Sequence, residues 1–188
     1  MRKLNVSTLV ALDGVMQDPG GFGELDQGGW ANPYFDEQAQ QLALENLLAS
    51  DFFLCGRVTF EAMYRSWSQL KEGAYMHRMS EIRKLVASTT LEEPLGWNAT
   101  VIKGDVAQEI ARIKQEPGGD IEMYGSAGLM RTLMRHDLID EYRIWIHPLV
   151  LGRGTRLFSE GGETTALRLA DTTQLASGVV IVTYHPAR

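Results

Sequence analysis

The chain has 188 residues, a formal net charge of -6 and a single cysteine, and 44% of its residues are hydrophobic. This length is typical of one globular domain, the lone Cys55 excludes an internal disulfide, and no run of about 18 apolar residues is present to span a bilayer. The acidic balance also disfavours nucleic acid and anionic membranes as partners. We therefore expect one domain over residues 1–188, located in the cytoplasm, that binds neither of them.

Predicted strands and helices alternate in the first half of the chain. Residues 3–12 predict a strand buried on both faces, because apolar side chains occupy both alternating positions. Residues 33–49 predict a helix with Pro33 in its first turn and leucines at helical spacing. A short apolar strand at 52–55 follows, and Gly56 joins it to a further helix.

The second half continues this alternation and then changes to strands alone. Strands are predicted at 84–88, 99–102 and 121–124, with helices beginning at Asp105 and after Gly125. The later apolar segments, at 142–146, 167–170 and 179–184, have only turns between them. The order predicts a three-layer α/β fold, in which a mostly parallel central sheet has helices on both faces and an antiparallel C-terminal edge.

The glycine-rich segment after the first strand reads DPGGFGELDQGG over residues 18–29. Glycines lower the free-energy cost of opening and closing a loop, because their backbone adopts many conformations. Phe22 and Trp30 provide apolar groups that would exclude water from a site when the loop is closed. A solvated connector and a mobile lid both remain open.

Two strand-to-helix junctions contain glycine, at Gly56–Thr59 and Gly125–Gly128. A helix that begins directly after a strand has unpaired backbone N–H groups at the positive end of its dipole, which is where phosphates bind. In an open α/β sheet these junctions lie at the carboxyl edge, so together they predict a pyrophosphate site. Neither matches a complete dinucleotide or nucleoside-triphosphate motif.

Three polar residues follow successive predicted strands or junctions: Arg57, Ser88 and Lys103. Parallel strand ends would bring them together as a cationic pocket with a hydroxyl group, suited to an additional phosphate. The four histidines lack metal-ligand spacing, so we expect no metal. Cys55 lies in an apolar strand and is expected to serve only in packing.

An ordered set of motifs resembles the dihydrofolate reductase-like superfamily. The set is LDG at 12–14, GRVTFE at 56–61, ASTT at 87–90, VIKG at 101–104, YGSAG at 124–128 and LIDEYRIWIHPLVLGRGTRLF at 138–158. Within it, the chain is similar to stand-alone proteins related to the C-terminal reductase domain of the bifunctional riboflavin-biosynthesis deaminase-reductase. The resemblance implies an eight-stranded fold that binds NADPH and a small-molecule substrate.

The resemblance also implies roles for particular residues. The pyrophosphate would lie against Gly56, Thr59, Gly125, Ser126 and Ala127, and the adenosine 2'-phosphate against Arg57, Ser88 and Lys103. Tyr124 stands where the riboflavin reductases usually carry an acidic residue, and Ser126 replaces the second glycine of their pair, which leaves the substrate open. The loop after the first strand resembles the one that closes over nicotinamide, which favours the lid.

These features together lead to the hypothesis of an NADPH-dependent reductase. It would transfer hydride to a C=N or C=O group of a pterin-like, pyrimidine-like or carbonyl substrate, with the proton supplied by Asp36, ahead of Glu37 or Asp13. The alternatives are a non-catalytic nucleotide- or pterin-binding protein on the same fold, and an interaction protein whose strand at 142–150 pairs with a second copy. A homodimer is compatible with catalysis.

Overall fold

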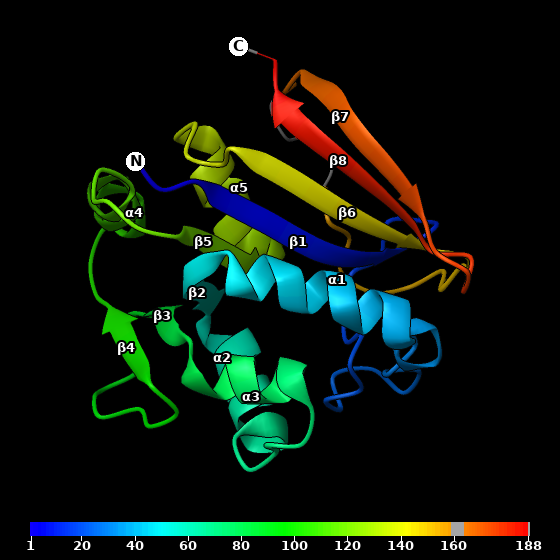
Figure 1. Ribbon diagram of the computed structural model, residues 1–188, viewed down its shortest axis with the longest axis horizontal. Helices are drawn as coiled ribbons and strands as arrows, with labels where there is room; N and C mark the ends of the chain where they lie inside the picture. Colours follow the sequence, from blue (N-terminus) through cyan, green and yellow to red (C-terminus); the bar gives the residue numbers. More distant parts are fainter. Residues whose placement is uncertain (159–163, 188) are drawn as a thin grey trace.

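The computed structural model describes residues 1–158 and 164–187 and contains one eight-stranded sheet (Figure 1). The strands are β1 (Leu4–Ala11), β2 (Ser50–Gly56), β3 (Arg83–Ala87), β4 (Ala99–Ile102), β5 (Asp120–Tyr124), β6 (Glu141–His147), β7 (Leu167–Gln174) and β8 (Val180–Pro186). Their order is β4-β3-β2-β5-β1-β6-β8-β7. The pairs from β4 to β6 are parallel, whereas β8 is antiparallel to both β6 and β7. The predicted parallel sheet with an antiparallel C-terminal edge is therefore confirmed.

Helices cover both faces of this sheet, as predicted. They are α1 (Glu37–Leu48), α2 (Arg57–Trp67), α3 (Ala74–Glu81), α4 (Val106–Lys114) and α5 (Ala127–Arg135), with a 3-10 turn at Asn32–Tyr34. One face packs against α4 and α5 through a cluster that includes Ile110, Met130 and Leu133. The other face packs against α1, α2 and α3 through Leu47, Met63 and Met79.

The first helix begins later than the sequence predicts. Pro33 lies in the 3-10 turn, and the α-helix begins only after Asp36, whose extended backbone and carboxylate cap the helix by accepting the N–H of Ala39. An N-cap residue is not helical, so Asp36 fixes the boundary. Helix α3 is not predicted by the sequence, since it is short and its N-cap, Gly73, provides no side-chain hydrogen bond.

The cores on the two faces of the sheet differ in character. The face toward α4 and α5 is apolar along β1 and β5, with Leu4, Val6 and Met123 all buried. The face toward α1 carries a buried polar strip on the same strands, which includes Ser7 and Glu122. Burial raises the pKa of the Cys55 thiol to about 12, in agreement with a packing role for this residue.

Candidate active site

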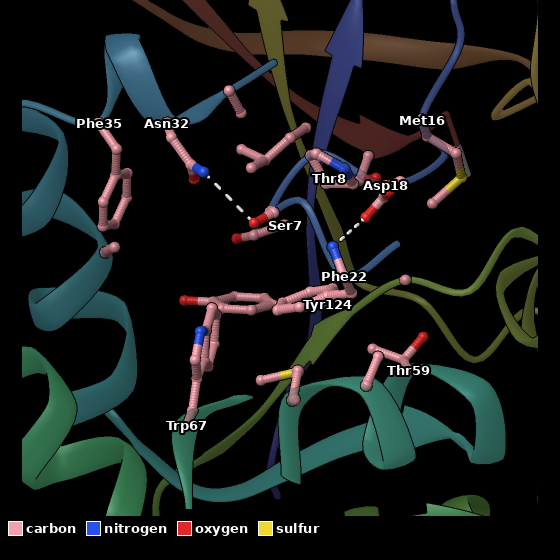
Figure 2. Close-up of a pocket in the computed structure, with 18 of the residues that line it drawn as sticks. Ser7, Thr8, Met16, Asp18, Phe22, Asn32, Phe35, Thr59, Trp67 and Tyr124 are labelled. Atoms are coloured by element: carbon pink, nitrogen blue, oxygen red, sulfur yellow. Dashed lines mark hydrogen bonds between the residues drawn. The ribbon is translucent and has the colours of Figure 1, made fainter. Parts of the chain in front are cut away.

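A large cleft opens at the carboxyl ends of β1 and β5, the two strands at the centre of the sheet. It has a volume of about 660 Å³, within the range of small-molecule sites. Figure 2 shows side chains from separate elements directed into it: Ser7 and Thr8 from β1, Tyr124 from β5, and Thr59 and Trp67 from α2. The carboxyl edge of a parallel sheet is where ligands bind in α/β folds.

The two glycine junctions meet at this cleft, as their order along the chain predicts. A Cβ on Gly56 would lie 3.1 Å from Ser126 Oγ, and one on Gly125 would lie 3.7 Å from Thr59 Oγ1. The missing side chain of Gly56 thus allows the starts of α2 and α5 to approach each other closely, whereas the Gly125 distance is an ordinary contact. Thr59, Gly125, Ser126 and Ala127 line the cleft. Because no side chain in the described part of the chain caps α2, its first N–H groups are available to bind an anion.

A second, smaller pocket of about 390 Å³ lies beside the ends of β3 and β4. Arg57 and Ser88 both line it, whereas Lys103 is exposed and lies in the chain between two lining residues, Ile102 and Gly104. The Ser88 hydroxyl oxygen accepts the N–H groups of Thr90 and Leu91, at 3.1 and 3.0 Å. Its own proton is left to donate, either to the Thr90 hydroxyl at 3.5 Å or to a ligand oxygen.

The loop after β1 forms one wall of the cleft and is organised by the buried Asp18. Its carboxylate accepts the backbone N–H groups of Phe22, Glu24 and Leu25, at 2.5, 2.9 and 3.0 Å. Figure 2 marks the first of these bonds. The Phe22 ring in turn packs edge-on against Trp67 of α2, with ring centroids 5.6 Å apart. This loop therefore has a defined structure over the cleft.

The walls of the cleft are mainly aromatic and apolar. Phe22, Phe35, Trp67, Tyr75 and Tyr124 all line it. Burial raises the pKa of both tyrosines, which bond to each other through their hydroxyl groups. Among the described residues, no lysine, arginine or histidine lines the cleft, and its acidic residues are Asp18, Glu24 and Glu72.

The three acids predicted as proton donors lie elsewhere: none is among the described residues that line the cleft. The Asp36 carboxylate caps α1, and Glu37 is exposed in the first turn of that helix. Asp13 accepts the backbone N–H of Gly152 at 2.8 Å. Partial burial raises the pKa of Asp13, but the N–H groups of Gly152 and Leu151 outweigh that effect and lower it, which is the opposite of what a proton donor needs.

The structure instead brings a buried acid, Glu122 of β5, beneath the cleft, where it does not line the cleft itself but contacts the lining residue Ser7. The Ser7 hydroxyl, which lines the cleft, donates to the Glu122 carboxylate at 2.5 Å, and Arg143 of β6 contacts it at 3.1 Å. An acidic residue inside the apolar strand IEMY is the sequence signal that indicates this site.

Within residues 1–158 and 164–187, no group of three or more His, Cys, Asp or Glu side chains is arranged to hold a metal ion. Likewise, no helix in those residues has the length and apolar character needed to cross a membrane.

Known proteins resemble this chain in sequence and in fold. The chain is similar to uncharacterized protein YyaP of Bacillus subtilis (strain 168), at 38% identity over 103 residues, which are 55% of this chain and about half (54%) of YyaP. A protein from Shewanella sp. PV-4 that is assigned to riboflavin biosynthesis shares the fold, with a TM-score of 0.74, 23% identity and 99% coverage of both chains.

Dihydrofolate reductase from Enterococcus faecalis, solved with NADP(H), also has this fold. Its TM-score is 0.63 at 15% identity, and the match covers 99% of this chain and 97% of that one. At such identities the likeness shows the fold, which is dihydrofolate reductase-like. The sequence itself matches the family model of the RibD C-terminal domain over residues 2–181, which include both glycine junctions and the whole cleft. The chain therefore belongs to the RibD C-terminal domain family.

Proposed function

We propose that the protein is an NADPH-dependent reductase that transfers hydride to a C=N or C=O group of a small planar substrate without a phosphate group. The observation that carries this proposal is the pairing of two sites at one sheet edge: an aromatic cleft beside two glycine junctions, and a polar pocket lined by Arg57 and Ser88. The oxidoreductase character of the family and the fold supports it.

The residues present suit this cofactor. Its pyrophosphate would lie against Gly56, Thr59 and Gly125–Ala127, where a Cβ on Gly56 would crowd Ser126 and where two helix dipoles favour negative charge. Its 2'-phosphate would lie between Arg57, Ser88 and the exposed Lys103. The cofactor supplies hydride, whereas the protein orients the substrate and excludes water with the Phe22 loop.

The lining of the cleft supports an unphosphorylated substrate. The helix N-termini at Thr59 and Ser126 are assigned to the cofactor's pyrophosphate, so a further phosphate on the substrate would need cationic partners, and none lines this cleft within the described part of the chain. The rings of Phe22, Phe35 and Trp67 instead offer surfaces for a flat heterocycle or quinonoid compound.

A substrate panel tests this proposal through the loss of reduced-nicotinamide absorbance. The panel pairs a pyrimidine nucleoside with its 5'-phosphate and adds a pterin, a quinone and an aliphatic ketone. We expect oxidation of NADPH with a planar, unphosphorylated member, and a lower rate with any phosphorylated partner. NADPH binding without turnover of any member would instead favour a non-catalytic binding protein, and preference for the phosphorylated compound would contradict the substrate class.

We also propose, in line with the sequence, a homodimer located in the cytoplasm. Leu12 and Val150 are exposed apolar residues on neighbouring segments, joined by the hydrogen bond from Leu12 N–H to the Leu149 carbonyl. Covering such a surface with a second copy is favourable. Sedimentation of the protein as a monomer at micromolar concentration would argue against the dimer.

A further inference from the structure

We propose that the buried carboxyl of Glu122, acting through the Ser7 hydroxyl, is the source of the proton for the reaction in the cleft. This inference rests on the proposed reductase function. A two-electron reduction of C=N or C=O by hydride requires one proton, and the acids that the sequence suggests lie outside the cleft. Glu122 and Ser7 provide a route that the sequence alone does not reveal.

The geometry places the pair directly beneath the ligand space. Ser7 lies on β1 beside Tyr124 of β5 and Arg143 of β6 in the sheet register. Glu122 and Tyr124 are two residues apart, so they face the same side of β5, and Tyr124 lines the cleft. Glu122 is 0% exposed, whereas Ser7 is 7% exposed and lines the cleft. The hydroxyl of Ser7 is thus the connection between the buried acid and a ligand.

The surroundings of Glu122 suit an acid that gains and loses a proton. Burial raises its pKa to about 7, although Arg143 and the Ser7 hydroxyl act in the opposite direction. These two partners stabilise the ionised form that remains after the proton has left. The titratable and charged groups that face Glu122 are Arg143 and Glu141 on β6, Asp120 and Tyr124 on β5, and Tyr75 on α3.

The transfer conserves atoms and charge. In the protonated state the hydrogen bond is reversed: the Glu122 carboxylic acid donates to Ser7 Oγ, and the Ser7 O–H is directed at the substrate. The Glu122 proton then passes to Ser7 Oγ while the Ser7 O–H bond breaks and that proton passes to the substrate nitrogen or oxygen, whose neighbouring carbon accepts hydride. The carboxyl becomes a carboxylate, held by Arg143. It regains a proton from water through Ser7 once the product has left the cleft.

A purely structural role is the competing explanation, because Arg143 links Glu122 and Glu141 in one ion network. Arg143 Nε contacts Glu141 at 2.6 Å, and Glu141 in turn contacts His185 at 3.0 Å. Since Glu141 shares the arginine but bonds to Arg143 and His185 and not to Ser7, Glu141→Gln is the matched control for Glu122→Gln.

The test combines carbon NMR of the Glu122 carboxyl in the ligand-free protein with the pH dependence of NADPH oxidation, using whichever panel compound turns over. The Glu122→Gln spectrum assigns the signal. We expect the carboxyl to titrate near pH 7 in the wild type and the rate to fall as pH rises through that midpoint. Glu122→Gln should lower the rate at acidic pH about 100-fold and flatten the profile, with NADPH affinity unchanged. Glu141→Gln should keep a pH-dependent profile, with its midpoint shifted downward because the Glu141 charge raises the pKa of Glu122.

Ser7→Ala provides a second variant whose folding does not depend on the buried charge. It should raise the Glu122 midpoint, because it removes a bond to the ionised form, and lower the rate. A Glu122 carboxyl that stays ionised between about pH 5 and about pH 9 would overturn the proposal. Equal rate losses in Glu122→Gln and Glu141→Gln would also overturn it. Failure of the wild type to bind NADPH would refute the reductase function instead. The NMR titration of the ligand-free protein would still show whether Glu122 titrates near pH 7, so failure of one proposal can be told apart from failure of the other.

Discussion

Replacement of Asp18 by alanine is expected to lower the free energy of unfolding by about 3 kcal/mol, or the melting temperature by about 6–12 °C. The Asp18 carboxylate accepts three backbone N–H groups of the loop that walls the cleft. Without it, these donors lose a charged acceptor. The loop is also packed around the carboxylate, since a Cβ on Gly28 would lie only 2.0 Å from Asp18 Oδ2.

Thermal unfolding and limited proteolysis within residues 18–29 would measure this effect. Asp26→Ala is the matched control, because Asp26 belongs to the same loop but its side chain is 91% exposed and makes one ion pair, to Arg153 at 3.4 Å. We expect that control to change stability by less than about 0.5 kcal/mol. Equal melting temperatures for the two variants would show that Asp18 does not organise the loop.

Replacement of Arg57 by alanine is expected to weaken NADPH binding about 10- to 100-fold and to leave NADH binding unchanged. A hydrogen bond to a charged group contributes about 1.5–3 kcal/mol, and only NADPH carries the 2'-phosphate that would receive it. The Arg57 side chain is 45% exposed and its guanidinium pairs with Glu61 at 2.9 Å. Solvent screening and competition from Glu61 should therefore keep the loss of affinity toward the lower end of this range.

Fluorescence titration of each cofactor would measure both affinities. Arg112→Ala is a suitable control, because Arg112 is also exposed on a helix and paired with glutamates three and four residues away, Glu109 and Glu116. It lines neither described pocket. If Arg57→Ala weakened NADPH and NADH equally, Arg57 would act on the shared part of the cofactor or on folding, and the small pocket would not be a phosphate site.

The sequence predicts the sheet well, for reasons visible in its hydrophobic patterns. Strands buried on both faces, such as residues 3–12, indicate the parallel centre of an α/β sheet, and turns alone between 142 and 184 indicate antiparallel neighbours. The positions of the two glycine junctions can also be predicted from the sequence, because a strand followed at once by glycine and a helix is a local pattern. Helix α3 carries no such local pattern and is missed.

The group of contacts beneath the cleft, in contrast, depends on strand order, which no local pattern encodes. Ser7, Glu122 and Arg143 are far apart in the chain and meet only because β1 lies between β5 and β6. For the same reason, Asp36 is a plausible acid in the sequence, yet its carboxylate is used to cap α1. The three backbone bonds of Asp18 likewise arise from a loop whose path the sequence does not specify.

The most direct test of the central claim is titration of the wild-type protein with NADPH and with NADH under one set of conditions. The pairing of a glycine-lined cleft with the Arg57 and Ser88 pocket predicts that NADPH binds, and that it binds about 10-fold or more tightly than NADH. Equal affinities would contradict a 2'-phosphate site, and the absence of NADPH binding would contradict the reductase function itself.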